Sequence, residues 1–291
     1  IGAAMALRGV LESSDQPFEI HVIGTPSEES LDGGKNEMAA HGGFDHIDVA
    51  FMVHGSTLTQ LETPSLALIE MDVEFHGKTA HAGIAPYAGR SAVDAVTMLQ
   101  TGLGLMRNHL KDSSRVSNIV LAGGTAVNSV PDFAKVKVEI RHSSMAYLES
   151  VEQWTREIAQ AAAMATQTQV QITPVAHIYN TTINDAMGAL LMECAEKFAC
   201  DGIAPPRKDC GSIGFGAVTH RLPSCFLRVK TLETDDPPPT DAWVKTGKGA
   251  RAHQGIYDGS VCCALAAFRL VTDEAAWQDV YQCFLAHQKE N

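Results

Sequence analysis

The sequence predicts an α/β protein in which one domain is split in the sequence and a ferredoxin-like domain is inserted into it. Three observations support this prediction. Strand, helix and strand patterns alternate before residue 64, an order typical of a parallel sheet. A βαββαβ order follows between residues 65 and 178. Helical patterns with one more strand then continue to the end of the chain.

The first part of the split domain is predicted from hydrophobic patterning. Residues 1–11 are apolar and helical, and residues 18–24 are typical of a short buried strand. Residues 33–41 predict a second helix. Residues 48–53 predict the next strand, with His54 just past its end.

The inserted domain is predicted to place its helices on one face of a sheet and to leave the other face open. Its expected elements are a strand at 66–75, a helix at 91–110, strands at 116–122 and 134–140, a helix at 148–166 and a strand at 170–175.

After the inserted domain, the chain is predicted to return to the split domain. The expected elements are a helix at 185–200, a turn at 211–222, a strand at 224–229, a proline-rich loop at 234–241 and helices at 258–271 and 274–288. The predicted domains are therefore residues 1–64 with 179–291, and residues 65–178.

Composition and charge exclude several classes of function. The chain is 45% hydrophobic and 19% charged, with a formal net charge of −12 and no run of Lys or Arg. Nucleic acid and anionic membranes are therefore not expected as partners. Seven cysteines, an odd number without a CxxC pair, favour reduced thiols and a cytoplasmic protein.

Two adjacent carboxylates, Glu28 and Glu29, follow the predicted strand 18–24. Ligands bind at the carboxyl ends of strands in open α/β sheets. One carboxylate there can bind a metal while the other acts as a general base. The alternative is that the two carboxylates are simply solvated in a loop, as is more common for two neighbouring glutamates.

Two histidines are candidates to complete a metal site with Glu29. His54 follows a predicted strand, and His253 lies in a glycine-rich segment expected to be a loop. Neutral imidazole is a natural ligand of zinc or manganese. Either histidine alone is more often an ordinary polar residue, so the three ligands form one joint hypothesis.

The inserted domain offers three further candidates. His81 lies among small residues after the first strand, so it is expected to be accessible and able to donate to a developing oxyanion. Asn128 and Arg141 carry an amide and a guanidinium, groups that suit a substrate carboxylate. Each of the three has a purely structural alternative.

Taken together, the motifs resemble those of the metal-dependent aminoacylase/carboxypeptidase G family of peptidases and amidohydrolases. The chain is most similar to the branch that holds aminobenzoyl-glutamate hydrolase and β-alanyl-lysine type dipeptidases. The motifs are GTPSEES followed by GGK, then FMVHGS, VEFHGKTAHAGIAPYAGRSAVDAV, GGTAVNSVPDFAKVKVEIR and GFGAVTHRLPS.

The resemblance implies a role for each candidate residue. Glu28 matches the general base that activates water, and His81 matches a lid histidine that reaches into the partner subunit's active site. The matching metal ligands are Glu29, His54 and His253, and the positions near the substrate carboxylate are Asn128 and Arg141. The inserted domain matches the family's lid and dimerisation domain, and the complete protein is expected to hold two divalent metal ions, Zn or Mn.

The chain departs from the family pattern at two places. The family's first histidine ligand and its bridging Cys or Asp belong to a motif before Ile1, so the chain is expected to be an N-terminally truncated fragment. The branch also has an acidic residue in a late turn, where this chain has Ser212-Ile213-Gly214-Phe215.

The resemblance implies a two-metal hydrolase that cleaves an amide or peptide bond in a small N-acyl amino acid or dipeptide and acts as a homodimer. The alternative is a non-catalytic relative that serves as a dimerising or binding subunit. A nicotinamide or flavin domain is excluded because no GxGxxG follows a strand.

Overall fold

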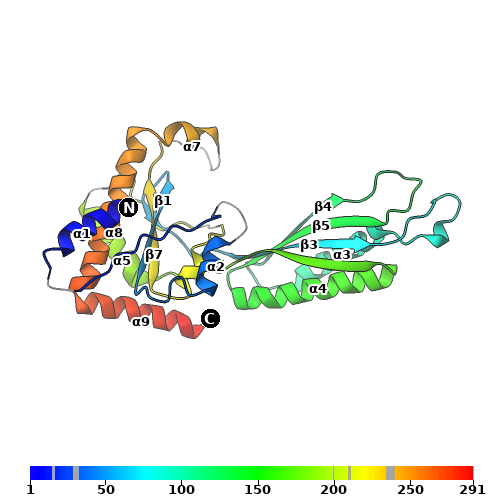
Figure 1. The fold of residues 1–291 in the computed structure, drawn as a ribbon, viewed down its shortest axis with the longest axis horizontal. Helices are drawn as coiled ribbons and strands as arrows, with labels where there is room; N and C mark the ends of the chain where they lie inside the picture. The colour runs from blue at the N-terminus through cyan, green and yellow to red at the C-terminus, as the bar shows by residue number, and fades with distance from the viewer. Residues whose placement is uncertain (15–16, 29–32, 199, 209–210, 234–239, 291) are drawn as a thin grey trace.

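The computed structural model describes residues 1–14, 17–28, 33–198, 200–208, 211–233 and 240–290. It shows two lobes side by side, with both chain ends in the first lobe (Figure 1). The first lobe holds a three-stranded sheet and the second a four-stranded sheet. This mixed α/β architecture confirms the predicted fold class, while the exact domain boundaries stay a prediction.

The first lobe is built around a parallel pair of strands from distant parts of the chain. Its elements are α1 (Gly2–Leu11), α2 (Gly34–Ala40), β1 (Ala50–Ser56), β2 (Gln60–Leu61), α5 (Asp185–Lys197), α6 (Gly216–Thr219), β7 (Ser224–Lys230), α7 (Asp241–Thr246), α8 (Ala250–Thr272) and α9 (Glu274–Glu290). β1 runs parallel to β7, and β2 pairs with β7 in the antiparallel sense. β7 lies between β1 and β2 in this sheet. Strands that are neighbours in space are therefore separated in the sequence by the whole second lobe.

Helix α8 packs closely against this sheet because small residues line its inner side. A Cβ at Gly255 would lie 2.7 Å from the carbonyl oxygen of Lys230, and one at Gly259 would lie 2.6 Å from Val53. Cys262 and Leu270 of α8 are buried in the same hydrophobic core. Among the described helices, α8 is the one long and apolar enough to cross a membrane by length and composition.

The structure corrects the extent of α8. The segment around His253 was expected to be a loop, but α8 begins at Ala250 and includes it. The glycines that suggested a loop are instead the places where the helix backbone approaches the sheet, as at Gly255.

Two further expectations in the first lobe are wrong. Residues 18–24 form no strand, and Val22 is 61% exposed, because these residues pair with no described strand. β1 continues to Ser56, so His54 lies within the strand and not past its end. The longer strand follows from pairing with β7 up to Lys230.

The second lobe has the predicted βαββαβ order. Its elements are β3 (Ala67–His76), the short helix η1 (Pro86–Ala88), α3 (Ala92–Met106), the short helix η2 (Arg107–His109), β4 (Arg115–Ala122), β5 (Phe133–His142), α4 (Met145–Thr166) and β6 (Gln169–Ile178). The sheet is antiparallel in the order β4-β5-β3-β6. Ser91 and Ser144 cap α3 and α4 through their side-chain oxygens.

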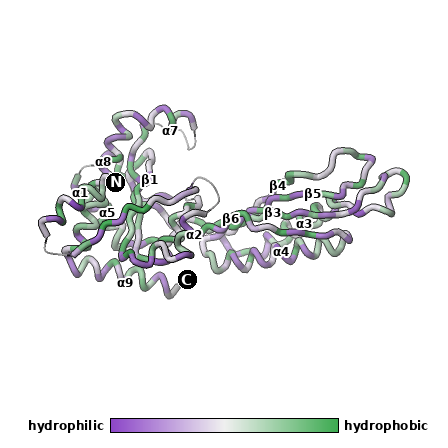
Figure 2. The backbone as a smooth tube through the Cα atoms, viewed as in Figure 1, coloured by the Kyte–Doolittle hydropathy of each residue, from purple (hydrophilic) through white to green (hydrophobic). Residues whose placement is uncertain are grey.

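The two faces of the second sheet differ sharply. Alternate residues of β5, such as Val136 and Val138, are fully buried in a core with α3 and α4. The residues between them face away from the helices and carry charges. Hydropathy alternates accordingly along the tube of this lobe (Figure 2).

The open face of the second sheet carries a ladder of paired charges. Lys135 Nζ lies 2.7 Å from Asp72 and 3.0 Å from Glu74, and Lys137 Nζ lies 2.6 Å from Glu70. The hydrogen bond to Asp72, and then that to Glu74, raise the pKa of Lys135. The hydrogen bond to Glu70 raises the pKa of Lys137 in the same way. The two lysines thus offset most of the negative charge of the three carboxylates on this face.

Strand β4 forms one edge of this sheet and is apolar. It pairs with β5 on one side only. Ile119 is 59% exposed, and Val120 and Leu121 are exposed beside it. An exposed apolar edge strand presents unpaired backbone groups that can pair with another strand.

We predict that the buried face of the second sheet dominates the stability of this lobe. Phe75 is fully buried among α3 and α4, whereas Phe133 lies partly exposed on the open face. Phe75→Ala should lower the free energy of unfolding by about 3–5 kcal/mol, because it leaves a cavity. Phe133→Ala, the matched control, should lower it by less than about 1 kcal/mol. Urea denaturation measures both, and equal losses would contradict the assignment of the core.

Candidate functional site

The two lobes are joined by a pair of reciprocal hydrogen bonds between the chain segments that cross from one to the other. The backbone N–H of Ser65 donates to Thr181 Oγ1 at 2.7 Å, and the N–H of Thr181 donates to Ser65 Oγ at 2.9 Å. Both residues are buried. The next N–H, that of Leu66, donates to the carbonyl oxygen of Gly211 at 3.0 Å. We call the Ser65–Thr181 pair the hinge clasp.

Glu28 lies at the end of an extended segment before α2 and is exposed. A Cβ built on Gly214 would lie 4.0 Å from Glu28 Oε1 and 3.8 Å from Lys35 Nζ. Glu28, the buried Lys35 and the late turn at Gly214 therefore meet in one place. Glu29, the other predicted carboxylate, lies outside the described residues.

His54 faces Arg228 across the parallel pair β1 and β7. Its Nδ1 lies 2.7 Å from the carbonyl oxygen of Gly55 and 3.0 Å from Arg228 Nη1. A carbonyl only accepts and a guanidinium only donates, so one ring nitrogen cannot serve both contacts. The shorter contact favours a proton on Nδ1, which leaves the Nε2 lone pair available to a ligand.

Arg228 is held in place by a buried carboxylate. The side chain of Glu62 is 0% exposed, and its Oε2 accepts from Arg228 Nε and, at 3.4 Å, from Arg207 Nη1. A buried carboxylate needs such cationic partners to stay charged. The Glu62–Arg228 pair thus fixes the guanidinium that borders His54.

The described residues do not form a complete metal site by themselves. His253 is exposed near the start of α8. Within the described ranges, no three side chains of His, Cys, Asp or Glu come together closely enough to hold a metal ion. Glu29, the third predicted ligand, lies outside these ranges.

The loops that carry His81 and Asn128 lie side by side in the second lobe. The N–H of Ala82 donates to the carbonyl oxygen of Asn128 at 2.9 Å. His81 Nδ1 accepts from the N–H of Gly83 at 3.2 Å, so the neutral ring carries its proton on Nε2. His81 is exposed and can offer this N–H to a developing negative charge.

Arg141 lies on the open face of β5 and reaches toward the first lobe. Its Nε and Nη2 bind the two oxygens of Glu139 at 2.7 and 3.0 Å. Its Nη1 lies 3.5 Å from Ser212 Oγ in the late turn. The guanidinium therefore lies at the junction of the lobes, with Nη1 directed at the turn that borders Glu28.

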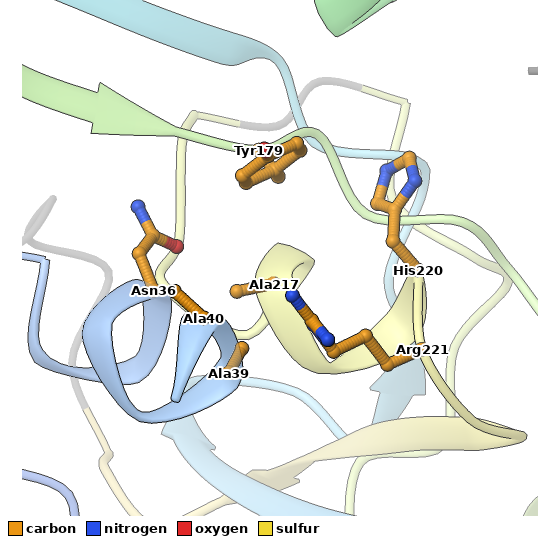
Figure 3. Close-up of a pocket in the computed structure, with 7 residues that line it drawn as sticks. All are labelled: Asn36, Ala39, Ala40, Tyr179, Ala217, His220 and Arg221. Carbon is orange, nitrogen blue, oxygen red and sulfur yellow. The ribbon is translucent and has the colours of Figure 1, made fainter. Parts of the chain in front are cut away.

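Sequence reasoning missed a second group of residues at the hinge. A cavity of about 340 Å³ is lined by Asn36, Ala39, Ala40, Tyr179, Ala217, His220 and Arg221 (Figure 3). Asn36 Nδ2 donates to the carbonyl oxygen of His177. Burial lowers the pKa of His220, whose Nε2 lies 2.9 Å from the carbonyl oxygen of Asn180. We call this cavity the hinge pocket. Its residues come from three segments that are distant in the sequence, so no local motif predicts it.

Comparison with known proteins relates the chain to a family of hydrolases. Residues 67–167 match the peptidase dimerisation domain of the M20 type. The chain is 32% identical over 229 residues to Xaa-Arg dipeptidase from Mus musculus, a match that covers 77% of this chain and 53% of that protein. It is also 32% identical over 191 residues to a p-aminobenzoyl-glutamate hydrolase subunit of Escherichia coli, covering 64% of this chain and 40% of that protein. The chain spans about half the length of the curated relatives it matches.

Solved structures share the fold. An aminobenzoyl-glutamate utilization protein from Klebsiella pneumoniae aligns with a TM-score of 0.69 at 22% identity, over 92% of this chain and 66% of that one. A dinuclear metal-binding peptidase of the M20 family from Bacillus subtilis aligns with a TM-score of 0.64 at 16% identity, over 92% and 70%.

We predict that the buried carboxylate beside the candidate site is important for stability. Glu62→Gln removes the charge that compensates Arg228 and should lower the free energy of unfolding by about 3 kcal/mol, the cost of breaking a buried ion pair. Glu193→Gln is the matched control, because Glu193 pairs with Lys197 on an exposed helix surface. That change should stay within about 0.5 kcal/mol. A neutral result for Glu62→Gln in urea denaturation would contradict the role given to the pair.

Proposed function

Because the chain is a relative of the M20 metallopeptidases and carries their dimerisation domain, we propose that it acts as a metal-dependent hydrolase. The proposed reaction is cleavage of an amide or peptide bond in a small N-acyl amino acid or dipeptide. The observation that carries this proposal is the sequence relationship to a dipeptidase and to an aminobenzoyl-glutamate hydrolase over most of the chain. The domains proposed for it are a catalytic domain (residues 1–64 and 179–291) and a lid (residues 65–178).

Two divalent metal ions, Zn or Mn, are the proposed cofactors. The dinuclear metal-binding peptidase with the same fold supports the number of ions. The proposed ligands in this chain are Glu29, His54 and His253, and the lone pair left on His54 Nε2 suits that role. When bound, such ions polarise a carbonyl group and lower the pKa of water.

Glu28 is the proposed general base. Its carboxylate is exposed, and it borders the late turn and Lys35, where an attacking water and a substrate both have access. It would take a proton from the attacking water and pass it to the leaving amine.

The lid is proposed to bind the substrate and steady the transition state. His81, with its proton on Nε2, would donate to the developing oxyanion. Arg141 Nη1 and the Asn128 amide would bind the substrate carboxylate. Arg141 suits this role because Glu139 fixes the fork of its guanidinium while Nη1 points to the junction of the lobes.

We further propose that the protein is a cytoplasmic homodimer. The matched dimerisation domain and the apolar edge strand β4 support the dimer. The described cysteines are all free thiols, which supports a reducing compartment.

One specific observation favours a second candidate function, that of a non-catalytic dimerising or binding subunit. The late turn that borders Glu28 carries glycine at position 214, where no acidic side chain is present. The two candidates differ in whether the metal-loaded protein hydrolyses such substrates.

We predict that Glu28→Gln lowers the rate of hydrolysis by the metal-loaded protein about 10²–10⁴-fold, because the amide cannot accept a proton. Its metal content should stay close to that of the wild type, whereas Glu29→Gln should lose metal. Glu37→Gln, an exposed change nearby on α2, is the control and should retain activity. The measurements are turnover of p-aminobenzoyl-glutamate and of a Xaa-Arg dipeptide, with metal analysis. Unchanged turnover in Glu28→Gln would contradict the role of Glu28 as the base. No turnover by the metal-loaded wild type would favour the non-catalytic alternative.

We also predict that β4 forms the contact between two copies. Light scattering of the wild type should give twice the 31.2 kDa of one chain. Ile119→Lys should weaken the dimer at least about ten-fold, because a charge on an edge strand opposes pairing. Met164→Lys replaces an exposed apolar residue of α4 and should leave the dimer intact. A wild-type monomer, or equal loss in both variants, would count against this interface.

A further inference from the structure

The hinge pocket is separate from the residues proposed for catalysis. Helix α2, the segment after β6 and the segment that begins with α6 form its wall (Figure 3). None of Glu28, His54, His81, Arg141 or His253 lines it. Its volume of about 340 Å³ suits a small organic molecule.

One wall of the hinge pocket offers a positive charge. Figure 3 shows the guanidinium of Arg221 turned back toward the centre, beside Ala217. Among the described residues, no hydrogen bond or ion pair engages the Arg221 side chain. An unpaired guanidinium in a concave site favours a carboxylate or phosphate, which it binds through two parallel hydrogen bonds.

The opposite wall offers an acceptor that lacks a donor. Asn36 Nδ2 donates to the carbonyl oxygen of His177, which fixes the orientation of the amide. Asn36 Oδ1 is buried and has no partner within the described part of the chain. Figure 3 shows this oxygen turned toward the side of the pocket where Tyr179 lies. A buried acceptor without a donor is unfavourable, so a bound N–H group would be stabilised there.

The remaining wall is aromatic and uncharged. The rings of Tyr179 and His220 lie 5.4 Å apart between centroids. His220 donates through Nε2 to the carbonyl of Asn180, and burial, which lowers its pKa, keeps the ring neutral. Arg221 is therefore the single charge among the described residues that line the pocket, and an inorganic phosphate would face the lone pairs of Asn36 Oδ1.

We infer that the hinge pocket binds a small carboxylate that also carries an N–H donor, with an apolar body against Tyr179. Arg221 would bind the carboxylate, and Asn36 Oδ1 would accept from the N–H. N-acyl amino acids and amino acids have this chemistry. The inference rests on the pocket lining and not on the proposed function, although the ligand class overlaps with the proposed substrates.

Such a ligand would lie in the first lobe, beside a contact with the second. Asn36 belongs to α2 of the first lobe, and its amide already contacts the carbonyl of His177 in β6 of the second. The lining residues of the pocket all belong to the first lobe. A bound ligand would therefore lie next to this contact without replacing it.

The test uses N-benzoylglycine, which combines a carboxylate, an amide N–H and an aromatic ring. Ligand-observed NMR titration of the full chain should show saturable binding. Arg221→Gln should weaken it at least about ten-fold, whereas Arg221→Lys, which keeps the charge, should weaken it less. Arg8→Gln, an exposed change of the same charge on α1, should have no effect. Benzoate lacks the N–H and N-methylbenzamide lacks the carboxylate, so both should bind about ten-fold more weakly.

A second set of variants distinguishes binding at the hinge pocket from binding at the proposed substrate site. Arg141→Gln should leave the binding of N-benzoylglycine at the hinge pocket unchanged. The inference is overturned if Arg141→Gln abolishes binding while Arg221→Gln does not, or if the wild type shows no saturable binding. It is also overturned if inorganic phosphate or benzoate binds as well as N-benzoylglycine, because the pocket would then be a simple anion site. None of these outcomes bears on the dependence of hydrolysis on Glu28.

Discussion

The hinge clasp is the interaction on which the arrangement of this molecule depends. Ser65 and Thr181 satisfy each other's backbone N–H groups where the chain crosses between the lobes. A buried N–H without an acceptor is costly, so this pairing fixes the two crossing segments side by side. The approach of Arg141 to Ser212 and the assembly of the hinge pocket both require that alignment.

A second constraint acts inside the first lobe. The parallel pairing of β1 with β7 places His54 opposite Arg228, and the buried Glu62 holds that guanidinium. Close packing of α8 through Gly255 supports the same two strands from one side. The candidate histidine thus rests on contacts between segments more than a hundred residues apart.

The parts of the fold that could be predicted from the sequence are those that have a local periodic pattern. The βαββαβ order was predicted because alternation along β5 and helical spacing along α4 are strong periodic signals. Glu28 was a candidate from its place after an expected strand and His81 from its small neighbours, and the resemblance to a known family then gave each its role. By contrast, Gly255 suggested a loop, because a sequence does not show that a helix backbone approaches a strand. Residues 18–24 had the apolar composition of a strand but no described partner.

Contacts between segments distant in the sequence could not be predicted, because they form only in the folded chain. The contact of Arg228 with His54 depends on strand register, and the hinge pocket depends on three segments that meet only in the folded chain. Neither has a spacing that a single sequence reveals. The tautomer assigned to His81 likewise follows from one backbone N–H, that of Gly83, whose position only the fold determines.

The charge ladder on the open sheet face has an electrostatic consequence for encounters between molecules. Residues 67–167 contain nine Lys and Arg and ten Asp and Glu, so this stretch has a net charge of −1 while the whole chain has −12. Nearly all of the surplus negative charge therefore lies outside that stretch. Exposed charges are screened beyond about 8 Å at physiological ionic strength, so the surplus elsewhere acts weakly at this surface. Two copies that approach through the second lobe therefore meet little long-range repulsion, whereas approach through the first lobe is opposed.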